Sequence, residues 1–508
     1  MEQTTKEYQG LLCNIYIVFL LVVLPLYTGG TYYKIGDTKY QLFHDVTLVC
    51  LGIWLLLEIF IIVSELIQNP RKKAFFPVLG EGWSFVDCFV TVYGLVSLSS
   101  AYLSQYETAW VGENDWYMGA VSQLLFVGIY FFVSRSAAMT RMVMYLVEAG
   151  FLIVIIVGIL NKLEIDPLNM FAGFTEMDWE FSHMLSTIGN INWLCGYCSV
   201  MLAFPVAGYL HGKEKWREIL CLGISVLGML LLCIQGSDSG WLIVMAALGL
   251  CLIIGVKKKE FFHKALVMAL GVVCLIPIMG QLVTMLEAQQ AIPVDGNMYA
   301  KMLRNEWWFV AAFLLTVIIF HKKLHGRAGK VLRMSILGAL VVLAMAVLLI
   351  KGVGLSGVSV AQWGSGRGAL WSMALQAFGK ADFMNKLFGV GPDCFGQYCA
   401  DIGLNTMIMD EGYWANSVFV NAHNEWLNHL VNIGFLGMLA YMGIFLCGLK
   451  RYRGMMLGLL VLAMYGVNSF FSFQQVMNTP LLFLVLGICE SRCRVYEQKR
   501  EKTVVLDN

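Results

Sequence analysis

The sequence predicts an all-α fold, a polytopic transmembrane helical bundle with one long, partly helical extracytoplasmic loop. Three observations lead to this prediction. Hydrophobic residues make up 58% of the 508 residues, and charged residues only 14%. Continuously apolar runs recur along the whole chain, each long enough for a helix to cross a hydrocarbon layer of roughly 30 Å. The polar connections between these runs alternate between basic and acidic composition.

The apolar runs predict about 14 membrane spans, because a helix needs roughly 20 apolar residues to cross a bilayer. A β-barrel is set aside, since its strands alternate apolar and polar residues whereas these runs are continuously apolar. Only Lys6 provides positive charge before the first run, and no small-residue cleavage site follows it, so we interpret that run as a retained span. The predicted spans are residues 11–28, 43–67, 84–103, 117–134, 141–160, 192–210, 218–234, 241–256, 264–285, 307–320, 331–352, 427–449, 454–473 and 479–490.

Lysine and arginine gather on alternate connections, which indicates that these connections lie in the cytoplasm. The basic connections are residues 71–73, 135–141, 213–217, 257–259, 322–330, 450–453 and the tail 492–502. The connections between them are acidic. Both termini are then expected in the cytoplasm, and residues 1–508 are expected to form a single integral membrane domain. The basic face indicates orientation in a lipid bilayer and gives no reason to expect a nucleic-acid partner.

Most of the 14 cysteines lie in or beside apolar runs, where cysteine acts as a small hydrophobe. Cys195 and Cys198 have redox spacing, but they lie in a predicted span without a thioredoxin-like context, so we interpret the spacing as coincidence. Cys394 and Cys399 fall on the outer side, where a local disulfide is one alternative.

Two acidic residues, Glu58 and Glu148, fall within predicted spans, where ionised groups are costly and often functional. In a transporter they could couple to protons. In other membrane proteins they line a polar groove, or they stay protonated and hydrogen-bonded within the bundle. We favour the structural role.

A polar, glycine-rich stretch at residues 353–426 forms the long loop and falls on the acidic, outer side. Within it, residues 370–378 have apolar side chains at helical spacing, and Gly366 and Gly368 permit tight backbone geometry just before them. Arg367 is then expected at a helix N-terminus, where amide groups and an arginine fork both favour phosphate oxygens. An interfacial helix whose arginine contacts lipid headgroups is the alternative.

The loop also contains a histidine, His423, just before the predicted span at 427–449. An imidazole with a pKa of about 6.5 can accept a proton from a sugar hydroxyl, and an interfacial hydrogen-bonding residue is the alternative. His429 is expected inside the span and on a different face, so the pair lacks metal-ligand spacing and no metal is expected. The glycine pattern at residues 389–396 follows no strand and contains proline, so we interpret it as a turn and not as a nucleotide site.

Taken in order, four motifs resemble the O-antigen ligase and polymerase superfamily, and the resemblance covers residues 230–450. The motifs are Gly366-Arg367-Gly368-x-x-Trp371, Phe388-Gly389-x-Gly391-Pro-x-x-Phe395, Ala422-His423-Asn424-Glu425-Trp426-Leu427 and Gly434-x-x-Gly437. Members of this superfamily transfer a glycan from an undecaprenyl diphosphate carrier to an acceptor on the outer side of the bacterial cytoplasmic membrane.

The resemblance implies a metal-independent glycosyltransferase of cell-surface polysaccharide biosynthesis, without a cofactor, in the inner membrane of a bacterium. Its partners would be a polyprenyl-diphosphate-linked glycan donor and a glycan or other hydroxyl acceptor. Arg367 would hold the diphosphate and stabilise the departing negative charge. His423 would orient or deprotonate the attacking hydroxyl, and Trp371, Asn424 and Glu425 are further candidate substrate-binding residues. The motifs do not distinguish a polymerase from a ligase.

This chain departs from the superfamily pattern at residues 237–240, Ser-Asp-Ser-Gly. Many members carry a Ser-Arg-Gly element ahead of an apolar span, so a serine stands where a second phosphate-binding arginine is expected. Asp238 and Ser239 are therefore candidate sugar-binding residues, or the element simply caps a helix. Arg304 or Lys301, on the neighbouring outer connection, could supply the missing cation.

Two other functions fit a chain of this composition. A lipid-linked oligosaccharide flippase or polysaccharide exporter predicts transport without a new glycosidic bond, together with dependence on Glu58 and Glu148. A noncatalytic assembly subunit predicts tolerance to substitutions in the loop and sensitivity at helix-packing surfaces. The length of the loop favours the transferase.

Overall fold

The structure is a computed structural model that describes residues 2–68, 82–137, 139–175, 183–290, 302–324, 326–352, 366–404 and 419–506. About 78% of the described residues are helical. The strands of the described part, β1 (Met184–Leu185) and β2 (Gly189–Asn190), form one short antiparallel hairpin. The predicted all-α class is therefore confirmed.

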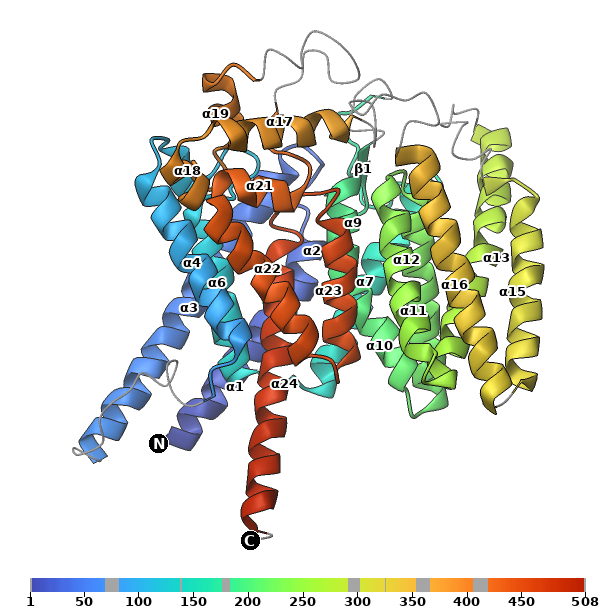
Figure 1. Cartoon of the computed structure of the whole chain (residues 1–508), viewed down its shortest axis with the longest axis horizontal. Helices are drawn as coiled ribbons and strands as arrows, with labels where there is room; N and C mark the ends of the chain where they lie inside the picture. Colours follow the sequence, from blue (N-terminus) through green and yellow to red (C-terminus); the bar gives the residue numbers. More distant parts are fainter. Residues whose placement is uncertain are drawn as a thin grey trace.

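The first half of the chain contributes long helices that run between the two ends of the molecule, together with a few short ones (Figure 1). They are α1 (Glu2–Val18), η1 (Phe19–Val23), α2 (Leu24–Leu26), α3 (Ile35–Gln68), α4 (Phe85–Leu103), α5 (Thr108–Val111), α6 (Ala120–Ser136), α7 (Arg141–Lys162), α9 (Ile191–Met201), α10 (Ala203–His211), α11 (Lys215–Ile234) and α12 (Asp238–Gly255). Local sequence sets some boundaries: α4 begins at a capping box in which Ser84 and Asp87 each bind the other's backbone N–H.

The second half adds further long helices and a group of short ones. They are α13 (Lys259–Gln290), α15 (Glu306–Lys323), α16 (Gly326–Gly352), α17 (Arg367–Lys380), α18 (Phe383–Phe388), α19 (Phe395–Asp401), α21 (Glu425–Asn432), α22 (Gly434–Arg451), α23 (Met456–Asn468) and α24 (Thr479–Leu506). The predicted helix at residues 370–378 is thus present as part of α17.

Within the described residues, 9 helices are long and apolar enough to cross a membrane. They are Thr4–Leu26, Ile35–Gln68, Phe85–Leu103, Arg141–Lys162, Ile191–His211, Lys215–Ile234, Asp238–Gly255, Lys259–Met285 and Gly434–Arg451. The multi-pass membrane class is supported, but the expected count of about 14 is not confirmed. Helices α6 and α23 coincide with predicted spans, yet they are apolar helices of shorter length.

The two ends of the bundle differ in composition and in structure (Figure 1). One end carries both termini, the end of α6, the start of α7 and the connections at residues 212–214 and 452–455; we call it the basic end. The other end carries α17, α18, α19 and α21, and α17 lies across the ends of the long helices; we call it the loop end. The basic connections therefore gather at one end, as the sequence predicts.

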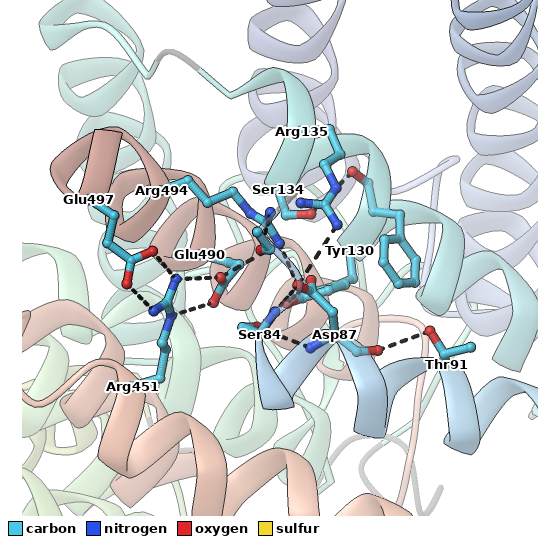
Figure 2. Close-up of polar contacts among 12 residues, drawn as sticks. Ser84, Asp87, Thr91, Tyr130, Ser134, Arg135, Arg451, Glu490, Arg494 and Glu497 are labelled. Carbon is cyan, nitrogen blue, oxygen red and sulfur yellow. Dashed lines mark hydrogen bonds and ion pairs between the residues drawn. The ribbon is translucent and has the colours of Figure 1, made fainter. Parts of the chain in front are cut away.

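Buried carboxylates and arginines fix the position of α24 at the basic end (Figure 2). Asp87 of α4 is fully buried and accepts hydrogen bonds from Arg494 and, at 2.9 Å, from Tyr130. Glu490 is also fully buried and pairs with Arg451 of α22 at 2.9 Å. Because an unpaired buried charge is strongly destabilising, these pairs hold α24 against α4, α6 and α22.

The two acidic residues predicted within spans both have protein partners. Arg217 donates two hydrogen bonds to Glu148, at 2.6 and 2.7 Å, and Gln9 donates one to Glu58 at 2.9 Å. These contacts agree with the favoured structural role.

The four cysteines singled out from the sequence are all free thiols. The disulfide alternative for Cys394 and Cys399 is thus not formed. Cys394 is the N-cap of α19 and Cys399 is the fifth residue of that helix. Cys195 and Cys198 are buried in α9, in agreement with coincidental spacing.

One predicted span is divided in two. The run expected at residues 427–449 forms the short helix α21, a break at Gly434 with φ of 70°, and the long helix α22. Gly389, with φ of 83°, approaches this break so closely that a Cβ on either glycine would overlap the backbone opposite. The predicted turn at residues 389–396 is confirmed, and it packs on the corner between α21 and α22. His429, expected inside a span, lies in α21 instead.

Candidate functional site

Three segments meet at the loop end beneath the start of α17. They are the first turns of α17, the residues just before α21, and the non-helical segment 469–478 between α23 and α24. The rings of His423 and Phe473 meet edge to face at 5.1 Å, and those of Trp371 and Phe471 lie 6.0 Å apart. Segment 469–478 therefore contacts both halves of the site predicted from the sequence.

Arg367 is the first residue of α17, and its position follows from the glycine before it. Gly366 has φ of 87°, a left-handed conformation that glycine adopts without strain, and it serves as the N-cap. The side chain of Arg367 is partly buried. It lies where the positive end of the helix dipole adds to its own charge, as the sequence predicts.

His423 sits in a strained turn held by asparagines. Its φ of 45° is uncommon for a residue with a Cβ. The backbone N–H of His423 donates to Asn421 Oδ1 at 3.0 Å, and that of Ala422 donates to Asn428 Oδ1 at 3.2 Å. Asn424 caps α21 by accepting from Leu427 N–H at 3.0 Å. Backbone strain of this kind persists only where the surroundings impose it, and it is common at functional sites.

The guanidinium and the imidazole lie within electrostatic range of each other. Burial and the positive charge of Arg367 lower the pKa of His423 to about 3. The imidazole is therefore neutral over the physiological pH range, and it can accept a hydrogen bond. With so low a pKa it is a weak base.

Glu425, a predicted substrate-binding residue, is fully buried behind the His423 turn. Its carboxylate accepts hydrogen bonds from Tyr441 and from Tyr465, the latter at 3.2 Å, and its backbone N–H donates to Ser469 O at 2.7 Å. Burial raises the pKa of Glu425 to about 8, and the two tyrosine hydrogen bonds lower it only in part. The carboxylate faces the inside of the bundle and ties α21 to α22 and α23.

His429 belongs to a second polar cluster, on a different face from His423. Its Nδ1 donates to the backbone oxygen of Glu425 at 2.6 Å, and its Nε2 lies 3.1 Å from the Tyr93 hydroxyl. Tyr93 also bonds Gln123 at 2.6 Å and Gln474 at 3.0 Å. Burial lowers the pKa of His429 to about 4, so this histidine is neutral as well.

A cavity of about 20 Å³ adjoins this cluster. Tyr93, Gln123, His429 and Gln474 contribute to its lining. Its volume suits roughly one water molecule and no sugar. Sequence analysis missed Tyr93, Gln123 and Gln474, and the available signal was the presence of glutamines in otherwise apolar runs.

The Ser-Asp-Ser-Gly element lies beside the site. Ser237 accepts the N–H of Ser239 as the N-cap of α12, so the capping alternative is observed. Cys195 of α9 interacts with both Ser237 and Arg367, which brings the element to the Arg367 side of the site. Asp238 is exposed, and the buried hydroxyl of Ser239 has no hydrogen-bond partner among the described residues.

Of the two predicted replacement cations, the structure describes only Arg304. Arg304 is exposed in the turn before α15, and no hydrogen bond or ion pair joins it to Arg367 or Asp238 in the described part of the chain. Stacking of Trp307 on Trp241, at 5.9 Å, brings that turn near the start of α12. Lys301 and the loop segments 353–365 and 405–418 lie outside the described residues.

No protein-family model and no curated protein sequence matches this chain. The resemblance to the O-antigen ligase superfamily therefore remains a prediction carried by the order of the motifs. Within the described ranges, no group of three or more His, Cys, Asp or Glu side chains could hold a metal ion.

Proposed function

We propose that this chain transfers a glycan from a polyprenyl diphosphate carrier to an acceptor hydroxyl, as an O-antigen ligase-like enzyme or a polysaccharide polymerase. The observation that carries the proposal is the electrostatic coupling between Arg367 and His423, two residues far apart in the sequence. A cation for a diphosphate next to a neutral imidazole for a hydroxyl is the pair that such a transfer requires.

We further propose that about 14 spans cross the cytoplasmic membrane of a bacterium, with the basic end in the cytoplasm and the loop end outside. The gathering of the basic connections and both termini at one end supports this orientation (Figure 1). In this orientation the site meets a lipid-linked donor at the outer rim of the bilayer.

In the proposed reaction, the guanidinium of Arg367 and the first amides of α17 bind the diphosphate oxygens. The bond between the anomeric carbon and the diphosphate oxygen breaks, and the electron pair leaves with the polyprenyl diphosphate. The acceptor oxygen bonds to the anomeric carbon, and its proton passes to His423. Arg367 stabilises the negative charge that grows on the leaving group, where a hydrogen-bonding cation lowers the barrier most.

Donor binding also activates the imidazole. Burial and the charge of Arg367 hold the pKa of His423 down. A bound diphosphate places negative charge beside Arg367 and offsets that effect, so the pKa of His423 rises and the imidazole becomes a better base. Proton acceptance is thereby linked to donor occupancy, which limits reaction with an acceptor when no donor is present.

Other predicted site residues take supporting roles in this proposal. Asn424 and Glu425 position His423, because one caps α21 and the other anchors that helix from behind. Trp371 offers an apolar face to a sugar ring or to the first isoprene units of the carrier. Asp238 and Ser239 lie on the Arg367 side and are assigned to sugar hydroxyls.

The test uses the purified full chain in nanodiscs with lipid-linked repeat units, and it follows glycan length or transfer to an acceptor. Arg367→Ala and His423→Ala are expected to abolish transfer. Lys380→Ala, at the opposite end of α17, and His44→Ala, whose ring lies 3.0 Å from Asp45 on α3, serve as matched controls. Full activity in both site variants would overturn the assignment of the site.

The same reconstitution separates the transferase from a flippase or exporter. Movement of the lipid-linked saccharide across the membrane without a new glycosidic bond would support the rival function. The second cation is tested separately: unchanged transfer in Arg304→Ala and Lys301→Ala would remove these residues from diphosphate binding.

A further inference from the structure

The basic end contains a larger pocket than any of those lined by the site residues described above. Its volume is about 460 Å³, within the range of small-molecule sites. Residues of α7, α10, α11, α23 and α24 and of the connections between them line it. The helix ends and connections that line it belong to the basic end, whereas α17 and α21 lie at the loop end (Figure 1).

Positive charge dominates this pocket. Arg141, Lys213 and Arg492 line it, and none of the three makes a hydrogen bond or ion pair with any residue that the structure describes. Glu214 supplies one opposing charge, and its carboxylate accepts a hydrogen bond from the indole Nε1–H of Trp216 at 2.6 Å. Three positive charges against one negative charge leave an excess that attracts anions, and a concave surface concentrates this field.

A buried ion pair forms one wall of the pocket and contributes no net charge. Arg217 donates to both oxygens of Glu148, and its guanidinium lies 4.5 Å from the centre of the Tyr145 ring. These contacts hold the Arg217 guanidinium in place, and Glu148 neutralises its charge. The charge available to a ligand is therefore that of Arg141, Lys213 and Arg492.

Apart from His211, most of the remaining lining is apolar and adaptable. Met139, Met144, Met455 and Met456 contribute side chains, together with Phe204 and Leu457. Methionine is flexible and fits apolar chains of varied shape. A ligand that satisfies both parts of the pocket carries an anionic head and an apolar tail.

We propose that this pocket binds an anionic phospholipid, with the phosphate held by Arg141, Lys213 and Arg492 and the first carbons of the acyl chains against the methionines. Basic pockets between transmembrane helices recognise such headgroups. Arg492 is carried on α24, which the buried pairs of Asp87 and Glu490 hold in place, so this cation is positioned before the lipid arrives (Figure 2).

The experiment measures lipid retention by native mass spectrometry of the full chain in detergent. Dioleoyl-phosphatidylglycerol is titrated against dioleoyl-phosphatidylcholine in mixed micelles, which compares the two headgroups at constant acyl chains. The wild-type chain is expected to retain phosphatidylglycerol selectively. The combined variant Arg141→Ala, Lys213→Ala, Arg492→Ala is expected to bind it at least tenfold more weakly.

A charge-matched control separates this site from general attraction to the membrane. The combined variant Lys257→Ala, Arg327→Ala, Lys330→Ala removes three exposed cations outside the pocket, and it is expected to keep the affinity of the wild type. Equal loss in both variants, or no loss in the pocket variant, would overturn the proposal. Thermal unfolding of each variant verifies that the fold is retained. The single variant Arg492→Lys keeps the positive charge and is expected to retain most of the affinity for phosphatidylglycerol.

Inorganic phosphate and diphosphate distinguish a lipid from a soluble anion. If millimolar inorganic phosphate displaces phosphatidylglycerol from the pocket, the site is specific for free phosphate and the lipid assignment is wrong. Lipid binding is read without glycan transfer, so the outcome is independent of the function proposed for the loop end.

Discussion

Removal of the Arg367 charge should raise the pKa of His423. The imidazole pKa is lowered from 6.5 to about 3, with burial the larger cause and Arg367 the second. The charge then accounts for less than half of that lowering. In Arg367→Gln, which keeps a polar side chain of similar length, we expect the pKa of His423 to rise by about one unit, or about 1.4 kcal/mol of interaction.

The pKa is read from NMR of the chain in nanodiscs with isotope-labelled histidine, and a His423→Gln sample assigns the signal among the 8 histidines. Lys380→Gln removes a cation from the far end of the same helix and should leave the titration unchanged. Addition of methylene diphosphonate, a stable diphosphate, should raise the pKa in the wild type and have little effect in Arg367→Gln. A wild-type pKa near 6.5, or the same pKa in Arg367→Gln, would refute the coupling on which the proposed mechanism depends.

Two further predictions concern the construction of the loop end. Gly434→Ala should destabilise the fold by about 2–4 kcal/mol, because it strains a positive φ and places a Cβ against the backbone of Leu387. Thermal unfolding measures this loss. The control is Gly249→Ala, where a Cβ meets nothing within 4 Å, and it should be close to neutral. Burial raises the pKa of Asp393 from 3.8 to about 7, so the folded chain holds that proton more tightly than the unfolded chain does. The resulting stabilisation is present below pH 4 and is lost as pH rises to 7. The unfolding temperature of the wild type should therefore fall over this pH range, and that of Asp393→Asn should fall less.

Local rules were enough to predict several parts of the structure. The apolar runs indicated a helical membrane protein, and Gly366 followed by apolar residues at helical spacing indicated a helix that begins near Arg367. The serine at position 237 offered capping as an alternative, and that cap is observed. Each of these features is decided by residues within a few positions of one another, so sequence alone carries the information.

Features that depend on distant partners could not be predicted in this way. Asn428, His429 and Asn432 interrupt the apolarity just before Gly434, which marks a polar turn of helix ahead of the span but not a break. The break itself depends on the approach of Gly389, which is remote in sequence. The bond between Tyr93 and Gln123, and their meeting with His429, likewise requires knowledge of which helices pack together. An isolated glutamine in an apolar run, such as Gln123, calls for a polar partner but does not identify it.

The non-helical segment 469–478 gives a reason to locate the site at the loop end that does not depend on any motif. It follows an apolar helix, and a bilayer tolerates such backbone only where protein or water satisfies its polar groups. Here protein satisfies several: Gln475 N–H donates to Asn478 Oδ1 at 2.9 Å, Asn478 Nδ2 donates to Phe473 O at 3.2 Å, and Ser469 O accepts from Glu425 N–H. Such an interrupted segment is costly to maintain, and it is the segment that presents Phe473 to His423. The physical chemistry of the membrane and the electrostatics of Arg367 thus favour the same few residues as the proposed site.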